Sequence, residues 1–136
     1  MNKLLLDTHI LLWSLLEPER LSDKVTSELE NPANEMWISP ITTWEIIILA
    51  EKGRVELNDE PVAWMQSVLN YVPFKQATLN HEVAIQSRQI KLPHQDPADR
   101  FIAASAAVYD LILVTSDKNL IKAAKSYSVF PNHRLR

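Results

Sequence analysis

The clearest buried strand of this 136-residue chain is predicted at Leu111-Ile112-Leu113-Val114-Thr115, directly before Ser116-Asp117. The opening residues repeat the pattern, because Asp7 follows at once on the run Lys3-Leu4-Leu5-Leu6. Short apolar runs of this kind are typical of strands in a parallel sheet covered on both faces. Since ligands collect at the carboxyl ends of such strands, Asp7 and Asp117 are expected at one edge of the sheet.

Helical segments are predicted between the strands. Their limits are marked by polar caps, by prolines and by the only glycine, Gly53. Helices are predicted at about 8–16, 23–30, 40–52, 61–71, 81–90, 97–109 and 118–126, and further strands at 36–39, 74–78 and 128–130. This alternation indicates an α/β fold, a central parallel sheet flanked by helices, in a single domain spanning residues 1–136.

The composition excludes several kinds of site. Without cysteine, the chain cannot form a disulfide framework, a thiolate zinc site or an iron–sulfur cluster. One glycine is too few for a P-loop or a dinucleotide-binding loop. The net charge of −3 argues against strong non-specific binding to nucleic acid, although bound divalent cations would still permit a nucleic acid substrate.

The sequence predicts a cytoplasmic protein that does not engage a membrane. No segment reaches the roughly 18 consecutive apolar residues of a membrane helix. The stretch from Met1 to Leu16 looks superficially like a signal peptide. However, Asp7 and His9 interrupt its apolar run, and no small-residue cleavage site follows.

Four carboxylates lie inside or beside apolar sequence: Asp7, Glu45, Asp99 and Asp117. A buried carboxylate is costly unless it is paired, protonated or bound to a metal. Four acids in such settings suggest one shared acidic site. A hard cation such as Mg²⁺ is the simplest way to neutralise that site.

Helix capping is the alternative interpretation of several acids. Asp7 and Asp117 each stand where a helix N-cap is expected, and Asp96 precedes Pro97 as a cap often does. Asp99 would then take the third helical position of a capping box, although Glu or Gln is usual there. Capping does not explain why this helix start carries two acids.

Glu45 is the acid that capping leaves unexplained. Its helix is apolar almost all round from Ile46 to Ala50, so the side chain is expected to be buried. A structural ion pair with Arg100 is the alternative to a metal site.

Histidines and tryptophans give weaker signals. The histidines lack the i, i+4 spacing of a helical metal site, and His9 and His94 are the two expected near the acids. The tryptophans occupy core-like positions and are interpreted as packing residues rather than base-stacking platforms. They are Trp13, Trp37, Trp44 and Trp64.

Four segments resemble, in order and spacing, the motifs of the PIN domain family, and in particular its VapC-type toxins from bacterial toxin–antitoxin pairs. The match covers nearly the whole chain. One departure is Ala98, where relatives often carry a bulky apolar residue. The segments are Leu4-Leu5-Leu6-Asp7-Thr8-His9, Ile38-Ser39-Pro40-Ile41-Thr42-Thr43-Trp44-Glu45-Ile46, His94-Gln95-Asp96-Pro97-Ala98-Asp99-Arg100-Phe101-Ile102-Ala103 and Leu113-Val114-Thr115-Ser116-Asp117.

The resemblance implies a three-layer α/β/α fold and a Mg²⁺-dependent endoribonuclease that hydrolyses RNA phosphodiester bonds. Mn²⁺ would also suit an all-oxygen site. The catalytic and metal-binding set carried over by position is Asp7, Glu45, Asp99 and Asp117, with Asp7 and Asp99 as the main ligands. The secondary residues are Asp96 at the edge of the site, Thr8 and Ser116 with hydroxyls for the metal or phosphate, and Arg100 beside a carboxylate.

The resemblance also implies partners: an RNA substrate, a second copy of the chain in a homodimer, and a cognate antitoxin protein that inhibits the enzyme. Relatives are inhibited by an antitoxin segment that crosses the apolar helices. The candidate docking residues here are Trp13, Leu16, Trp44 and Ile48, although core packing is the competing role for each.

Three other functions stay open at this point. One is a PIN-domain RNA-processing nuclease that is not a toxin, and another is a catalytically silent scaffold that binds RNA or protein. The third is a receiver-like signalling domain. That class calls for a second acid next to Asp7, where this chain has Thr8, and its central strand should end in an aspartate rather than at Ser39-Pro40.

Overall fold

The computed structural model describes residues 1–93 and 95–133. His94, which was expected near the acids, and residues 134–136 lie outside the described residues. In chain order the elements are β1 (Lys3–Leu6), α1 (Thr8–Leu16), the 3₁₀ helix η1 (Pro18–Arg20), α2 (Asp23–Glu30), β2 (Glu35–Ile38), α3 (Pro40–Glu51), α4 (Pro61–Tyr71), β3 (Lys75–Gln76), α5 (His81–Gln89), α6 (Pro97–Val108), β4 (Ile112–Thr115), α7 (Lys118–Lys122) and β5 (Ser128–Pro131).

The helices begin and end for the reasons that the sequence predicts. Ser39 caps α3 by accepting from the Ile41 N–H at 3.1 Å, and Pro40 follows at the first helical position. Gly53 stands just beyond the C-cap Lys52 with φ +71°, the left-handed conformation that a glycine adopts without strain.

Two elements are shorter than predicted. The strand expected at 74–78 is reduced to the two exposed residues of β3 at the edge of the sheet. The helix expected to reach residue 126 ends at Lys122. There the chain turns so that Tyr127 is buried, and its hydroxyl donates to the Leu120 carbonyl at 2.6 Å.

The sheet has the order β3-β2-β1-β4-β5, and all its paired strands are parallel. β1 lies at the centre, with Leu5 paired to Trp37 of β2 and to Leu113 of β4. The order differs from the 2-1-3-4-5 order of receiver-type sheets, which removes the receiver-like alternative.

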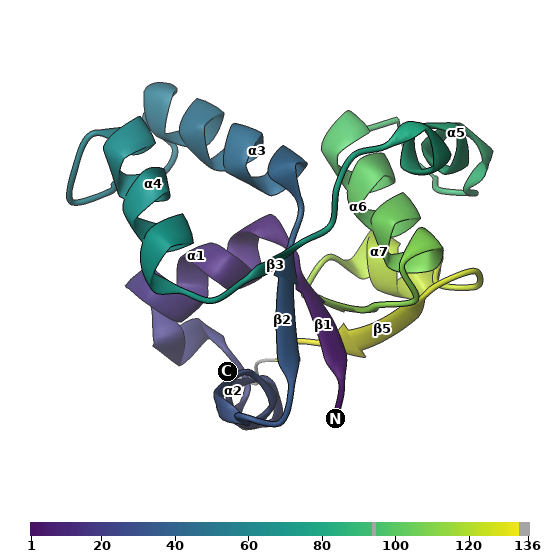
Figure 1. The fold of residues 1–136 in the computed structure, drawn as a ribbon, viewed down its shortest axis with the longest axis horizontal. Helices are drawn as coiled ribbons and strands as arrows, with labels where there is room; N and C mark the ends of the chain where they lie inside the picture. Colours follow the sequence, from purple (N-terminus) through teal and green to yellow (C-terminus); the bar gives the residue numbers. More distant parts are fainter. Residues whose placement is uncertain (94, 134–136) are drawn as a thin grey trace.

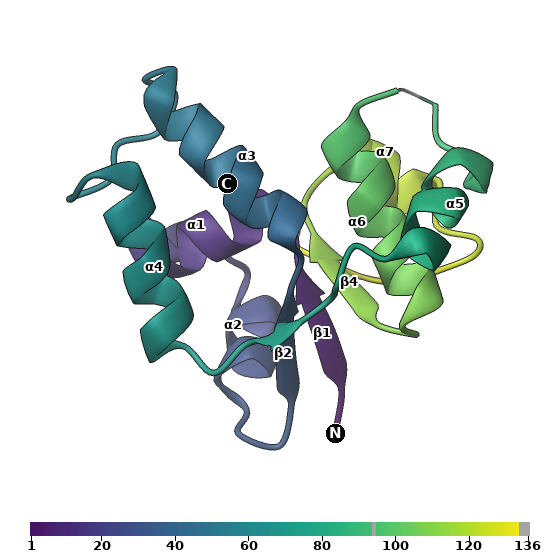
Figure 2. The ribbon, with the colours of Figure 1, turned by 45° about the horizontal axis from the view of Figure 1, so that its top comes forward.

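Helices cover both faces of the sheet, so the fold is the expected three-layer α/β/α arrangement (Figure 1). Leu4 and Leu6 of β1 point into a core shared with α1 to α4, whereas Leu5 points into the core formed with α6 and α7. The alternation of side chains along a strand places neighbouring leucines in different cores. Figure 2 shows α3 and α6 on opposite sides of the upper end of the sheet.

One tryptophan departs from the packing interpretation. Trp44 of α3 is 53% exposed, whereas Trp64 is buried. α3 is apolar almost all round, but only Thr42 and Ile46 are fully buried. The outer side of this helix therefore carries apolar surface that no other element of the described chain covers. None of the helices in the described ranges has the length and apolar character needed to cross a membrane.

Candidate active site

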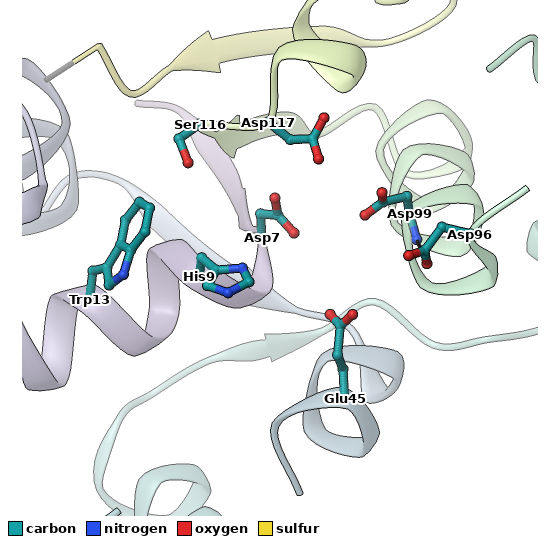
Figure 3. A pocket seen from close by; sticks show the side chains of 8 residues that line it. All are labelled: Asp7, His9, Trp13, Glu45, Asp96, Asp99, Ser116 and Asp117. Atoms are coloured by element: carbon teal, nitrogen blue, oxygen red, sulfur yellow. Dashed lines mark hydrogen bonds between the residues drawn. The ribbon is translucent and has the colours of Figure 1, made fainter. Parts of the chain in front are cut away.

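The predicted acids meet in a pocket of about 350 Å³ at the carboxyl edge of the sheet (Figure 3). Strand ends and helix starts converge there, so residues far apart in sequence become neighbours. The pocket is lined by Asp7, His9, Trp13, Glu45, Asp96, Asp99, Ser116 and Asp117. The structure thus brings together all five predicted acids, Ser116 and His9. Thr8 and Arg100 do not line the pocket.

Asp7 lies at the bottom of the site, where β1 passes into α1. Its side chain is only 8% exposed. One carboxylate oxygen, Oδ1, accepts from the Thr8 N–H at 2.8 Å, and the other, Oδ2, accepts from the Thr115 hydroxyl at 2.6 Å. Burial raises the pKa of Asp7 above its ordinary value, and the two hydrogen bonds oppose that rise.

Thr115 is the site residue that sequence reasoning missed. It ends β4 and is fully buried. Besides donating to Asp7, its hydroxyl oxygen accepts from the Asp117 N–H at 3.0 Å. One hydroxyl therefore holds two of the predicted acids in register. The available signal was a hydroxyl at the end of an otherwise apolar strand, two residues before an acid.

Glu45 enters the pocket from α3 on the opposite side (Figure 3). It is half-buried rather than fully buried as predicted, because its side chain lines the open pocket. Thr8 is itself buried, and its hydroxyl donates to Glu45 Oε1. The role at a metal or phosphate that the resemblance assigns to Thr8 stays a prediction. Burial, followed by the Asp7 and Asp96 carboxylates, raises the pKa of Glu45, whereas the Thr8 hydrogen bond lowers it.

Asp96 and Asp99 both come from the start of α6. Asp96 is the N-cap, as predicted, and accepts from the Ala98 and Asp99 N–H groups at 3.0 and 3.3 Å. Asp99 shows the strongest effect of the shared pocket. Burial raises its pKa to about 8, and the carboxylates of Asp7, Asp96, Asp117 and Glu45 contribute to that rise.

Arg100 has a structural position next to the site. It is buried, and its guanidinium donates to the backbone carbonyls of Ser87 at 2.8 Å and Ile90 at 2.6 Å. These bonds bind α6 to the end of α5 and so support the helix that carries Asp99. The expectation that Arg100 fixes a neighbouring carboxylate stays a prediction.

The donor set fits a hard divalent cation. Five carboxylates face one pocket, and burial together with the neighbouring carboxylates raises the pKa of Asp99, a cost that a bound cation would relieve. Within the described residues, however, no group of three Asp, Glu or His side chains is already gathered closely enough to hold an ion. Water molecules would have to complete the coordination, which suits Mg²⁺ because it dehydrates reluctantly.

Comparisons with known proteins agree with this architecture. The PIN domain model matches residues 4–126. Ribonuclease VapC22 from Mycobacterium tuberculosis is 32% identical over 123 residues, covering 88% of this chain and 91% of that protein.

Two crystal structures share the fold at lower identity. DNA-bound VapBC from Salmonella typhimurium has a TM-score of 0.71 at 23% identity, over 96% of this chain and 98% of that chain. VapBC-5 from Mycobacterium tuberculosis, a member of the VapBC family of toxin–antitoxin systems, has a TM-score of 0.62 at 15% identity, over 97% and 98%. Fold, motif order and family model agree, and the chain belongs to the PIN domain family.

Proposed function

We propose that this protein is a Mg²⁺-dependent endoribonuclease and the toxin of a type II toxin–antitoxin pair, with Mn²⁺ as an alternative metal. The observation that carries the proposal is the pocket of five carboxylates contributed by separate segments of the fold. The relative named a ribonuclease supports the same conclusion, because it aligns with almost the whole chain.

Asp7, Glu45, Asp99 and Asp117 would hold the metal. When bound, Mg²⁺ would lower the pKa of a water molecule and balance charge on the phosphate oxygens. Thr115 would keep the Asp7 carboxylate in place through its 2.6 Å hydrogen bond. Thr8 fixes one oxygen of Glu45, so the raised pKa of that carboxyl makes it suitable for accepting a proton from the attacking water.

Cleavage of a labelled single-stranded RNA by the purified protein tests the enzymatic part. We expect cleavage with Mg²⁺ and none with EDTA. Asp7→Asn should abolish cleavage, whereas Asp23→Asn, which changes an exposed acid of α2, should not. Loss of cleavage in both variants, or in neither, would contradict the assignment of the site. A folded wild-type protein that never cuts RNA would instead be a silent scaffold.

Growth of a bacterial host tests the toxin part. Induction of the wild-type chain should arrest growth, and induction of Asp7→Asn should not. RNA cleavage in vitro without growth arrest would favour the processing nuclease. Equal arrest by both chains would show that toxicity does not depend on the acidic site. The protein would act in the cytoplasm, where its RNA substrate would be.

For the antitoxin we propose a groove of about 860 Å³ beside the acidic pocket. The groove is lined in part by Leu12, Leu16, Leu49 and Val55, and it shares His9 and Trp13 with the pocket. A bound segment would therefore reach the acids directly. Of the expected docking residues, Trp13 and Leu16 line this groove, whereas Trp44 and Ile48 do not.

Co-purification with the product of a neighbouring antitoxin-like gene tests this placement. Leu16→Asp should weaken the complex, and Ile85→Asp, an exposed position on α5, should leave it intact. An unaltered complex with Leu16→Asp would exclude the groove.

We also propose a homodimer, because Trp44 exposes apolar surface on α3. A solution mass of 15.6 kDa measured by light scattering, which is the mass of one chain, would contradict the homodimer.

A further inference from the structure

The charges of this acidic protein are unevenly distributed. Residues 118–136, which follow Asp117, contain five Lys or Arg and no Asp or Glu. The preceding 117 residues contain nine Lys or Arg and all 17 acids. A polyanionic substrate that approaches five carboxylates needs positive charge close by, and this segment starts at the acidic site itself.

Part of this positive charge lines a surface groove of about 290 Å³. The lining residues are Lys91, Pro93, Asn119, Lys122, Ala123 and Lys125. They contain three lysines and no carboxylate. All three lysines are exposed, and no ion pair is formed by any of them within the described part of the chain. Their charges are therefore available to a ligand.

The groove and the acidic pocket meet at the start of α7, where a residue of the groove contacts a residue of the pocket. Asn119 lines the groove, and its N–H donates to the Asp117 carboxylate at 2.8 Å. The groove is thus built partly on α7, and α7 lies on the side of the sheet that also carries α5 and α6 (Figure 2). A strand with its scissile phosphate among the acids would need to extend only a short way past Asp117 to reach the lysines.

We propose that this lysine groove, Lys91, Lys122 and Lys125, binds the phosphate backbone of the RNA substrate next to the cleaved bond. The proposal rests on the proposed function, since the acidic site must face RNA. Lysines suit this role because they neutralise phosphates without reading bases. The groove would therefore contribute affinity and alignment, and sequence preference would arise elsewhere.

Salt dependence of RNA binding tests the groove. The probe is a short fluorescein-labelled oligouridylate, and its affinity is followed by anisotropy with Mg²⁺ in the Asp7→Asn background, where the RNA stays intact. Each neutralised phosphate of a single strand contributes about 0.7 to the slope of log K against log salt. Lys91→Gln, Lys122→Gln and Lys125→Gln combined should lower that slope by about 2. Near 0.1 M salt, binding should weaken roughly 100-fold.

A matched variant controls for net charge. Lys3→Gln, Lys24→Gln and Lys52→Gln remove three exposed lysines from other parts of the surface. This control should keep the slope of the Asp7→Asn parent. Equal salt-dependence slopes for the two triple variants would overturn the groove proposal, because the change in RNA binding would then follow net charge alone.

RNA cleavage by the chain with Asp7 intact separates the two proposals. If the protein cleaves RNA but the salt-dependence slope of the groove variant is unchanged, the groove proposal is wrong and the nuclease proposal stands. If the slope of the groove variant is lowered but the protein does not cleave RNA, the groove proposal is supported and the nuclease proposal is wrong. If the protein does not bind RNA at all, both proposals are wrong. If the groove variant loses binding to polyglutamate but not to RNA, the groove belongs to an acidic polypeptide and the proposal is wrong.

Discussion

Thr115→Val tests whether one hydroxyl positions the acidic site. Valine has nearly the shape of threonine, so the change removes the hydroxyl and little else. The Asp7 Oδ2 atom would lose a 2.6 Å hydrogen bond, and the Asp117 N–H would lose its 3.0 Å acceptor. Both groups lie at the carboxyl edge of β1 and β4, where Thr115 is fully buried.

The size of the effect depends on the charge of Asp7. A hydrogen bond to a charged group contributes about 1.5–3 kcal/mol to stability, and one between neutral groups about 0.5–1.5 kcal/mol. The pKa of Asp7 is raised in the folded protein, so the carboxyl is neutral in acid and ionised only above that raised value. The lost Asp117 contact adds a cost that does not depend on pH. The stability cost of Thr115→Val should therefore grow by about 1 kcal/mol from acid to alkaline pH.

Urea unfolding of the metal-free protein, followed by circular dichroism, measures this cost. Each variant is unfolded at a series of pH values that runs from acid to alkaline, so that the series spans the raised pKa of Asp7. The same series of measurements in the Asp7→Asn background completes a double-mutant cycle, in which the pH-dependent part should vanish. Expressed as a melting temperature, 1 kcal/mol corresponds to roughly 4 °C for a domain of this size.

Two results would refute the reasoning. A cost that stays the same across the whole pH series would mean that the Asp7 carboxylate does not depend on Thr115. A pH-dependent cost that persists in the Asp7→Asn background would assign the effect to another acid, such as Asp117. In either case Thr115 would not be the residue that positions the Asp7 carboxylate.

Four further predictions concern the acid pocket and α3. Asp99 binds a proton with a pKa of about 8, so Mg²⁺ affinity from isothermal titration calorimetry should rise about tenfold per pH unit below that value and level off above it. The raised pKa of Asp99 makes the metal-free fold lose stability as pH rises through about 8. Asp99→Asn should therefore unfold at a higher temperature than the wild type in alkaline buffer with EDTA, and a lower unfolding temperature would contradict this. Thr42→Val should stabilise by about 1 kcal/mol in urea, because among the described residues the Thr42 hydroxyl is the buried side-chain group without a hydrogen-bond partner. Gly53→Ala should lower the free energy of unfolding by about 1–2 kcal/mol in the same assay. The cost arises from the φ of +71° alone, since nothing lies within 4 Å of the added methyl group. An unchanged urea midpoint would show that the backbone relaxes.

Sequence alone predicted the sheet and its edge well, because the relevant signals are local. Apolar runs marked β1 and β4, and Pro40 and Gly53 marked the limits of α3. The end of α7 was wrong, because burial of Tyr127 turns the chain before the helical pattern ends. The exposure of Trp44 was also missed, since an all-apolar helix does not reveal which of its sides the rest of the chain leaves uncovered.

The candidate site was predicted from acids in apolar surroundings, which is a signal that a single sequence can show. Thr115 could not be found in this way, because threonine also suits a strand for its shape alone. Its role depends on pairing across the sheet. Asp7 donates its backbone N–H to the Val114 carbonyl at 3.0 Å, which brings the next residue of β4 beside the carboxylate. The hydrogen bond between Thr115 and Asp7 joins residues 108 positions apart, and no local pattern encodes it.

Capping and metal binding were competing interpretations of the acids, and the geometry allows both. Asp7, Asp96 and Asp117 each accept hydrogen bonds from the N–H groups that open the following helix. An N-cap contributes about 1 kcal/mol, which offsets part of the cost of the burial and repulsion that raise the pKa of Asp99. The acids can therefore stay in place before a metal arrives. Glu45 caps no helix and is held by Thr8, so it is the acid whose loss should separate activity from stability most cleanly.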